Sequence, residues 1–276
     1  MIIDAFPFMN ELEIVEIRLN ELDSLVDHFV IVESLEVHGN PRKKPANLRD
    51  NWHIVKPFEH KVTYILLDHL EPPYTDDDRS RWGRENYQRL ALTVPVTALS
   101  TSPEDIIIVS DCDEIPRASA VRDALPRIAT GIHQLSLDFF YYNVNCCVNK
   151  KWAVSTIGTL KHYQEIGGFQ IARNTGSDCG KPHRAVIEDA GWHFSYFGHD
   201  AAKLKYKAEN VAESHRSMIA DFINRDPRQA TIDIANCVDI YRDPTMPMIR
   251  RDTHDPRLPA YFLNNIERFK HCTDGK

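Results

Sequence analysis

Four consecutive β-branched residues, Ile106–Val109, are followed closely by three acidic residues, Asp111, Asp113 and Glu114. The apolar run is too short for a helix and has proline a few positions away on either side, which predicts a buried strand of a parallel sheet covered on both faces. Ligands of open α/β sheets bind just beyond the carboxyl ends of the strands. The acidic residues are therefore expected to stand where such a fold binds its ligand.

The first two acids have the spacing of a metal site. Side chains alternate along an extended chain, so Asp111 and Asp113 point the same way if the strand continues that far. Neighbouring carboxylates repel each other, and a divalent cation such as Mn²⁺ or Mg²⁺ removes this repulsion while bridging to phosphate oxygens. The simpler alternative is a solvated turn whose aspartates cap the following helix.

The first 145 residues alternate between strand-like and helix-like segments, which predicts a doubly wound α/β sheet. Helices are expected over 12–26, 84–99 and 119–128, and strands over 29–32, 62–67 and 133–142, with Pro95 ending or kinking the second helix. Beyond residue 143 the pattern loosens, leaving a short aromatic strand at 191–198 and helices at 201–216 and 219–224. We expect a main domain over 1–220 and a helical or irregular extension over 221–276 that packs on it.

Composition argues against several functional classes. The 276 residues include 40 acidic and 33 basic side chains, a net charge of −7, which disfavours nucleic acid or an anionic membrane as a partner. No apolar run approaches the roughly 20 residues that span a bilayer, and the N-terminus lacks the pattern of a secretory signal. The six cysteines show no C-x-x-C pair, so we expect reduced thiols, no zinc, and a cytoplasmic location.

Six sequence blocks occur in the order of one enzyme family. They cover residues 6–13, 16–22, 26–34, 66–69, 105–117 and 190–196, and the last of them reads Ala190-Gly-Trp-His-Phe-Ser-Tyr196. Such an ordered series is more specific than any acid pair, and the chain resembles glycosyltransferase family 17. The resemblance implies a GT-A-type fold, a nucleotide-sugar donor such as UDP-GlcNAc, and inverting transfer to a glycan or other hydroxyl acceptor. Because no membrane anchor or stem is evident, a soluble bacterial or viral type of relative is expected.

The resemblance also suggests which residues bind the metal. Asp113 is expected to bind it directly, and Asp111 to contact the metal, a metal-bound water or the ribose. His193 is a third candidate ligand, with a structural histidine as the alternative.

An inverting transfer needs a general base, usually a carboxylate, to deprotonate the acceptor hydroxyl. Glu188 and Asp189 are candidates because they stand just before the Gly-Trp-His block. Glu114 is a further candidate for a catalytic or supporting role, although it could equally belong to the start of the following helix.

Several polar side chains are candidates for binding the donor. Near the start of the predicted helix over 84–99, a side chain could reach the donor, or Glu85 and Arg89 could form a surface pair. Trp192 could stack on a sugar ring or belong to the core. The spacing from His193 to Lys203 is loosely similar to the His-x-x-Gly-x-x-Lys motif of glycogenin-like GT-A enzymes, in which the lysine binds diphosphate. The candidates are Glu33, Arg84, Asn86, Gln88, Trp192 and Lys203.

Two other functions compete with glycosyl transfer. Phosphohydrolases with an aspartate nucleophile also place Asp-x-Asp after a strand, but they require Thr or Val where this chain has Ile115. A sugar- or nucleotide-binding domain without catalysis is the second alternative. Selective stabilisation by UDP with Mn²⁺ would favour the transferase over both.

Overall fold

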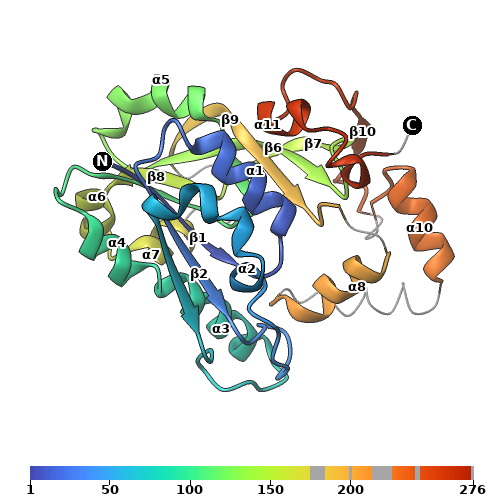
Figure 1. Cartoon of the computed structure of the whole chain (residues 1–276), viewed down its shortest axis with the longest axis horizontal. Helices are drawn as coiled ribbons and strands as arrows, with labels where there is room; N and C mark the ends of the chain where they lie inside the picture. The colour runs from blue at the N-terminus through green and yellow to red at the C-terminus, as the bar shows by residue number, and fades with distance from the viewer. Residues whose placement is uncertain (175–183, 199–200, 213–225, 240–242, 275–276) are drawn as a thin grey trace.

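The computed structural model describes residues 1–174, 184–198, 201–212, 226–239 and 243–274. In this part of the chain a central ten-stranded sheet carries helices on both faces (Figure 1). The strands are β1 (Ile2–Phe8), β2 (His28–Ser34), β3 (Val62–Leu67), β4 (Ile106–Val109), β5 (Glu114–Pro116), β6 (His133–Tyr141), β7 (Cys146–Trp152), β8 (Thr156–Thr159), β9 (Ala185–Ser195) and β10 (Met248–Arg250). The predicted α/β fold is confirmed.

The sheet is parallel in one half and largely antiparallel in the other. Its main path runs β10-β7-β6-β8-β4-β1-β2-β3. Strands β3, β2, β1 and β4 are parallel, whereas β4 pairs antiparallel with β8. Strand β9 lies parallel to β6 and antiparallel to β5. The strand that leads into the acidic residues therefore lies in the middle of the sheet, with its carboxyl end beside that of β1.

The sequence does not predict β1, because Asp4 and Pro7 interrupt its apolar pattern. In the structure Asp4 is fully buried and accepts hydrogen bonds of 2.6 and 2.8 Å from the guanidinium of Arg18. A paired carboxylate can occupy a core position that an unpaired one cannot. The Arg18 pair therefore allows an acidic residue inside a central strand.

Helices cover both faces of the sheet. They are α1 (Leu12–Leu22), α2 (Asn47–Asp50), α3 (Asp78–Leu90), α4 (Thr93–Leu99), α5 (Ala118–Ile128), α6 (Leu160–Glu165), α7 (Phe169–Asn174), α8 (Ala201–Asn210), α10 (Pro227–Ala235) and α11 (Ala260–Asn264), with 3₁₀ turns at Trp52–Ile54, Lys56–Lys61 and Lys270–Cys272.

The helix predicted over 84–99 is two helices, α3 and α4. Helix α3 begins earlier than expected because Asp77 caps it, accepting the Ser80 backbone N–H at 2.8 Å. Pro95 lies in the first turn of α4, where proline is tolerated. The helix predicted over 219–224 and the end of the one over 201–216 lie outside the described residues.

Alternate side chains of the central strands belong to separate cores. In β1, Phe6 and Phe8 pack with residues of α1 and α11, whereas Ile3 and Ala5 pack with residues of α4, α6 and α7. Helix α5 covers a further cluster formed with β4, β6, β8 and β9. The middle of the sheet is thus buried on both faces, as the apolar run of β4 predicts. Within the described ranges, no helix has the length and hydrophobicity that a membrane span requires.

A disulfide corrects the expectation that all six cysteines are reduced. Cys146 at the start of β7 is bonded to Cys237, which follows α10 after a separation of 91 residues. No sequence motif marks so distant a pair. Disulfides persist in oxidising surroundings, so the cysteines no longer support the predicted cytoplasmic location. Of the others, Cys112, Cys147 and Cys272 are buried free thiols, and Cys179 lies outside the described residues.

Replacing Cys237 with Ser is expected to lower the free energy of unfolding by about 2–4 kcal/mol, because a cross-link across a long loop restricts the unfolded chain. Urea unfolding without reductant measures the change. Dithiothreitol should lower the midpoint of the wild type and leave that of the variant unchanged. Equal midpoints of the two proteins without reductant would show that the disulfide adds no stability.

Candidate active site

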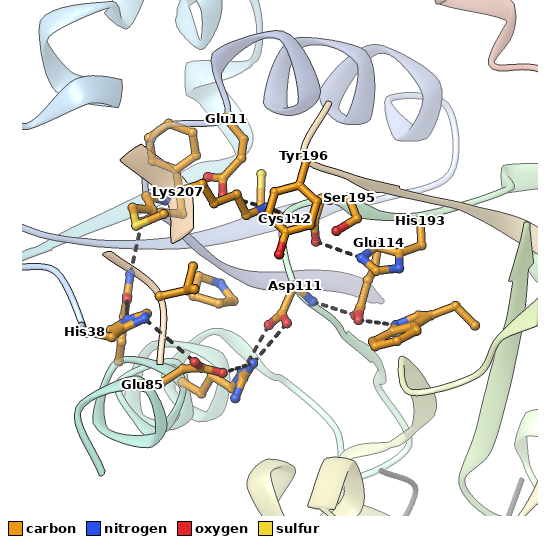
Figure 2. A pocket seen from close by; sticks show the side chains of 18 of the residues that line it. Glu11, His38, Glu85, Asp111, Cys112, Glu114, His193, Ser195, Tyr196 and Lys207 are labelled. Carbon is orange, nitrogen blue, oxygen red and sulfur yellow. Dashed lines mark hydrogen bonds and ion pairs between the residues drawn. The ribbon is translucent and has the colours of Figure 1, made fainter. Parts of the chain in front are cut away.

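A cavity of about 310 Å³ opens at the carboxyl ends of β1 and β4, beside the end of β9 (Figure 2). Strand β1 has β2 on one side and β4 on the other, so the chain order of the strands reverses here. A crevice at such a point is the usual ligand site of an open α/β sheet. The lining includes Phe8, Met9, Glu11, His38, Glu85, Gln88, Arg89, Asp111, Asp113, Glu114, His193, Tyr196 and Lys207.

A tight turn, rather than an extended chain, carries the acidic residues. The Glu114 backbone N–H donates to the Asp111 carbonyl at 3.0 Å, and the Asp111 N–H donates to the Glu114 carboxylate at 2.8 Å. Arg18 of α1 is fully buried and donates to the carbonyls of Asp111 and Glu114 at 2.8 and 2.9 Å. The expected alternation of Asp111 and Asp113 therefore does not apply, although both line the cavity.

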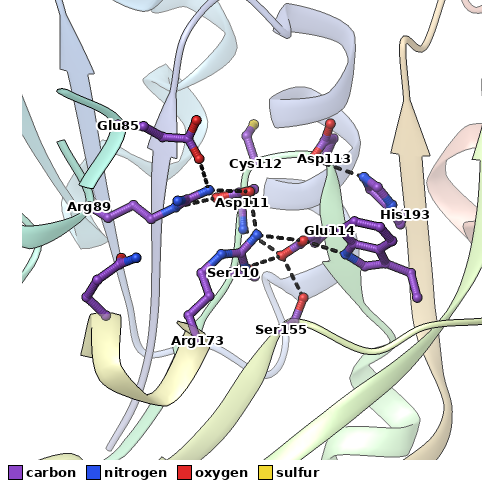
Figure 3. Close-up of polar contacts among 12 residues, drawn as sticks. Glu85, Arg89, Ser110, Asp111, Cys112, Asp113, Glu114, Ser155, Arg173 and His193 are labelled. Atoms are coloured by element: carbon purple, nitrogen blue, oxygen red, sulfur yellow. Dashed lines mark hydrogen bonds and ion pairs between the residues drawn. The ribbon is translucent and has the colours of Figure 1, made fainter. Parts of the chain in front are cut away.

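Asp111 faces two arginines (Figure 3). Arg89 of α3 donates to its carboxylate at 2.9 and 3.1 Å, and Arg173 of α7 donates to the same group. Burial alone would raise the pKa of Asp111, but Arg173 and Arg89 bring it below its ordinary value. Asp111 is therefore an anion whose charge the protein already balances.

Glu114 is engaged on both carboxylate oxygens. It accepts hydrogen bonds from Trp152 at 2.6 Å, from Ser155 at 2.7 Å and from Arg173 at 2.8 and 2.9 Å. Burial would raise the pKa of Glu114, but Arg173 outweighs it and holds this pKa well below the usual range. With 1% of its surface exposed, Glu114 supports the turn and does not present a catalytic carboxylate.

Asp113 lies between Lys207 and His193. Lys207 of α8 donates to one carboxylate oxygen at 3.1 Å, and His193 Nε2 lies 3.7 Å from the other. Burial would raise the pKa of Asp113, but Lys207 and His193 hold it well below its usual range. This carboxylate therefore stays ionised at neutral pH.

Strand pairing places His193 beside the acidic turn. Gly191 has a φ of 146°, and a Cβ there would come within 2.1 Å of a β5 carbonyl, so glycine allows β9 and β5 to approach closely. The resulting register pairs His193 with Glu114. Its ring lies 4.7 Å from that of Phe139 and 4.5 Å from that of Trp152. Its buried Nδ1 has no hydrogen-bond partner among the described residues.

Asp113 and His193 fit a divalent cation in their chemistry, since they present a carboxylate oxygen and an imidazole nitrogen 3.7 Å apart. Asp111 adds no third ligand in this arrangement, because guanidinium groups contact its two oxygens. In the described parts of the chain, no group of three or more His, Cys, Asp or Glu side chains is arranged to hold a metal ion. The structure thus brings two of the three predicted ligands together and turns the third toward arginine.

Among the predicted donor-binding residues of α3, only Gln88 lines this cavity. Arg84 is buried elsewhere and donates to the Glu36 carboxylate at 2.8 Å and to three backbone carbonyls. Asn86 accepts a hydrogen bond of 2.8 Å from Gln170. Arg84 and Asn86 therefore hold α3 against its neighbours.

Glu33 is also occupied within the protein. It is fully buried and accepts hydrogen bonds from Lys44 at 2.6 Å, from Tyr64 at 2.8 Å and from the Leu48 backbone at 3.1 Å. Both of its carboxylate oxygens are thus hydrogen-bonded inside the protein. Glu33 is therefore held among its own neighbours and does not line the cavity.

The two remaining candidates for donor binding lie outside the main cavity. Trp192 is 2% exposed, donates to the Arg257 carbonyl at 2.8 Å and has the Arg117 guanidinium 4.4 Å from its ring centre. It is a core residue, which agrees with the simpler alternative. Lys203 of α8 lines a smaller adjoining cavity of about 110 Å³.

Glu188 and Asp189 do not reach the site. Both are exposed, and the Asp189 side chain is 83% exposed and pairs with Lys151 at 2.7 Å. They lie in an irregular stretch of β9, where the pairing with β6 shifts from Leu135–Ile187 to Leu137–Gly191, and neither residue lines the cavity. The structure therefore does not bring either candidate base to the lining of this cavity.

Sequence reasoning misses several cations of the site. Arg18 has a detectable signal, because it lies three residues after Val15 and four before Leu22, on the apolar stripe of α1. The suspected surface pair of α3 lines the cavity, with Arg89 and Glu85 12% and 13% exposed. Arg173 and Lys207 carry no signal, because helices far along the chain bring them to the acidic turn.

A family model described as glycosyltransferase family 17 matches residues 1–276. The chain belongs to glycosyltransferase family 17. Membership of this family favours glycosyl transfer over the phosphohydrolase alternative.

Curated relatives match part of the chain. The beta-1,4-mannosyl-glycoprotein 4-beta-N-acetylglucosaminyltransferases of Rattus norvegicus and Homo sapiens are each 34% identical over 125 residues. The match covers 44% of this family-17 chain and 22% of those enzymes, or about a fifth of their length.

Solved structures give weaker likenesses. One is 4-diphosphocytidyl-2C-methyl-D-erythritol synthase from Anaerococcus prevotii, with a TM-score of 0.40 and 7% identity over 82% of this chain and 98% of that one. Another is the inositol-1-phosphate CTP transferase of T. maritima, with a TM-score of 0.38 and 11% identity over 67% of this chain and 84% of that one.

Proposed function

We propose that this family-17 glycosyltransferase moves GlcNAc from UDP-GlcNAc to a hydroxyl group of a glycan, with inversion at the anomeric carbon. The names of the rat and human relatives support the donor sugar, since they specify N-acetylglucosaminyl transfer. The observation that carries the proposal is the cavity at the carboxyl ends of β1 and β4, where Arg89 and Lys207 lie among several carboxylates. Such a surface suits a charged nucleotide-sugar.

Two cations that line the cavity suit the diphosphate of this donor. Lys207 is paired with Asp113 at 3.1 Å, and Arg89 with Asp111 at 2.9 Å. The diphosphate gains negative charge as the glycosidic bond breaks, and cations already in place stabilise that charge. We expect Lys207 and Arg89 each to contact the bound diphosphate while remaining paired with their carboxylates.

We also propose that Asp113 and His193 hold Mn²⁺ or Mg²⁺. The bound cation would supply further positive charge toward the departing diphosphate. Asp113 is suited to this role because it remains ionised, its pKa being well below the ordinary value. His193 is suited because Phe139 and Trp152 fix its ring and its Nε2 lies 3.7 Å from the Asp113 carboxylate.

Glu11 is the cavity carboxylate that we propose as the general base. Its Oε2 accepts the backbone N–H groups of Met9 and Asn10 at 3.1 and 2.9 Å, while its Oε1 lies 4.0 Å from Lys207 Nζ. The other lining carboxylates each contact a cation at 3.1 Å or less. Backbone hydrogen bonds thus fix one oxygen of Glu11. Among the carboxylates that line the cavity, Glu11 lies farthest from its nearest Lys or Arg nitrogen.

Glu11→Gln is expected to lower the rate of UDP-GlcNAc hydrolysis by roughly a hundredfold or more, because general base catalysis contributes about that factor. The affinity for UDP should change little. Steady-state kinetics and calorimetric titration with UDP measure the two quantities separately. A variant with unchanged hydrolysis, or one that loses UDP binding in parallel with activity, would remove Glu11 from this role.

The proposed donor is tested by the nucleoside diphosphate released from different donors at equal concentration. With Mn²⁺ and no acceptor, we expect slow hydrolysis of UDP-GlcNAc and much slower hydrolysis of UDP-glucose and GDP-mannose. A pocket that hydrogen-bonds the base and the acetamido group leaves buried polar groups unpaired with the wrong donor, which costs about 1–3 kcal/mol each. If a GDP- or dTDP-sugar is hydrolysed fastest, UDP-GlcNAc is not the donor. If no nucleotide-sugar is hydrolysed, the alternative of a binding domain without catalysis is favoured.

A further inference from the structure

Next to the acidic turn, the cavity wall holds an imidazole and a carboxylate that face each other, joined in Figure 2 by the dashed line of a long ion pair. His38 Nδ1 lies 3.8 Å from Glu85 Oε2, which is beyond hydrogen-bonding distance. Both residues line the cavity, and each side chain is 13% exposed. Two polar side chains that lie this close, with a gap between them, without bonding to each other can both form hydrogen bonds to a bound ligand.

Gln88 determines which nitrogen of His38 carries the proton. Its amide nitrogen donates to the carbonyls of Phe8 and Val32 at 3.0 and 2.9 Å, which uses both of its hydrogens. Its amide oxygen therefore faces His38 Nε2, at 2.7 Å. Because that oxygen is an acceptor, the hydrogen of a neutral imidazole is on Nε2, and Nδ1 presents a lone pair.

The surroundings favour the neutral imidazole. Burial lowers the pKa of His38, and the nearby Arg89 and Arg84 lower it further, against the opposing effects of Glu85 and Gln88. Glu85 in turn has its Oε1 fixed by Arg89 at 2.5 Å, so that Oε2 is the oxygen toward His38. The gap is consequently bordered by two hydrogen-bond acceptors, Nδ1 and Oε2.

We propose that His38 and Glu85 bind the two ribose hydroxyl groups of the nucleotide-sugar, an inference that rests on the proposed function. A ribose diol offers two O–H donors on neighbouring carbons, one for each acceptor. The edge of uracil offers a single N–H between two carbonyl oxygens, and these would face the acceptors unfavourably. The gap therefore matches the sugar of the nucleotide better than its base.

The position of the pair fits the rest of a nucleotide. Glu85 is joined through Arg89 to Asp111 at the end of β4, so a ribose at the gap has its diphosphate on the side of the acidic turn. The carbonyls of Phe8 and Val32 that anchor Gln88 belong to the carboxyl ends of β1 and β2. The nucleoside would then lie across the ends of these two strands.

The test is calorimetric titration of the full chain, with Mn²⁺ present, using UDP, GDP and their 2′,3′-dideoxy analogues. The wild type is expected to bind UDP roughly ten- to a hundredfold more tightly than dideoxy-UDP, since two acceptors lose their donors. Glu85→Gln keeps an oxygen for Arg89 and turns an N–H₂ group toward His38, which closes the gap. In this variant and in His38→Phe, the preference should fall to about threefold or less, with the affinity for dideoxy-UDP nearly unchanged.

Glu165→Gln, at an exposed position on α6, is the matched control and should keep the wild-type preference. Equal binding of UDP and dideoxy-UDP by the wild type would overturn this inference while leaving the proposed function intact. Variants that change the ratio of UDP to GDP, but not the ribose preference, would show that the pair contacts the base, and would also overturn it. Failure of every nucleotide to bind would overturn both.

Discussion

Replacing Asp113 with asparagine is expected to reduce UDP-GlcNAc hydrolysis roughly a hundredfold or more. Asp113 is the carboxylate that contacts Lys207 at 3.1 Å and approaches His193 to 3.7 Å. An amide has the same shape, but it neither binds a divalent cation well nor balances the charge of Lys207. The rate of UDP release with Mn²⁺, before and after chelation with EDTA, measures the effect.

The expected loss of hydrolysis in Asp113→Asn must be distinguished from a loss of folding. The urea midpoint of Asp113→Asn should stay close to that of the wild type, because the amide preserves packing around the turn. Asp123→Asn, on the exposed face of α5, provides an acid-to-amide control that should keep full activity. If Asp113→Asn retains a third or more of the wild-type rate, or if EDTA leaves the wild type fully active, Asp113 does not hold a catalytic cation.

Replacing Arg18 with methionine is expected to lower the free energy of unfolding by about 3–5 kcal/mol. Arg18 is fully buried, binds both oxygens of the buried Asp4, and donates to Ser110 and to three carbonyls of the acidic turn. Methionine fills much of the volume but leaves the Asp4 charge without a partner in the core. Urea denaturation at neutral pH measures the loss.

A double variant separates the charge effect from the packing effect. Asp4→Asn combined with Arg18→Met removes both charges, so it should be less destabilised than the sum of the single variants by about 1–3 kcal/mol. Simple additivity would show that the Asp4–Arg18 contact contributes nothing of its own. An Arg18→Met protein within about 1 kcal/mol of the wild type would contradict the structural role of Arg18.

Strands with a nearly continuous apolar pattern are predictable from the sequence, whereas β1, which has the buried Asp4 in its interior, is not. The run Ile106–Val109 and the strand over 62–67 match β4 and β3 residue for residue. Strand β1 escapes prediction because its Asp4 is neutralised by a residue of the following helix. The Cys146–Cys237 bond escapes it too, since local pattern carries no information about partners 91 residues apart.

The same limit applies to the site. The position of Asp113 and His193 follows from the acid-tipped strand and the Gly-Trp-His block, and the structure places them together. Whether a charged side chain is available to a ligand depends on its partners. Glu33 and Arg84 look like ligand-binding residues in the sequence, yet each is buried and paired with a neighbouring side chain. Lys207 is indistinguishable in the sequence from a surface lysine of α8, yet it reaches Asp113.

A crystal structure of the protein grown with UDP and Mn²⁺ tests the location and chemistry of the site most directly. We expect the nucleotide in the cavity at the ends of β1 and β4, with its diphosphate within hydrogen-bonding distance of Lys207. The cation should contact Asp113 and His193. A nucleotide bound away from this cavity, or a cavity that stays empty at saturating UDP, would contradict the proposed active site.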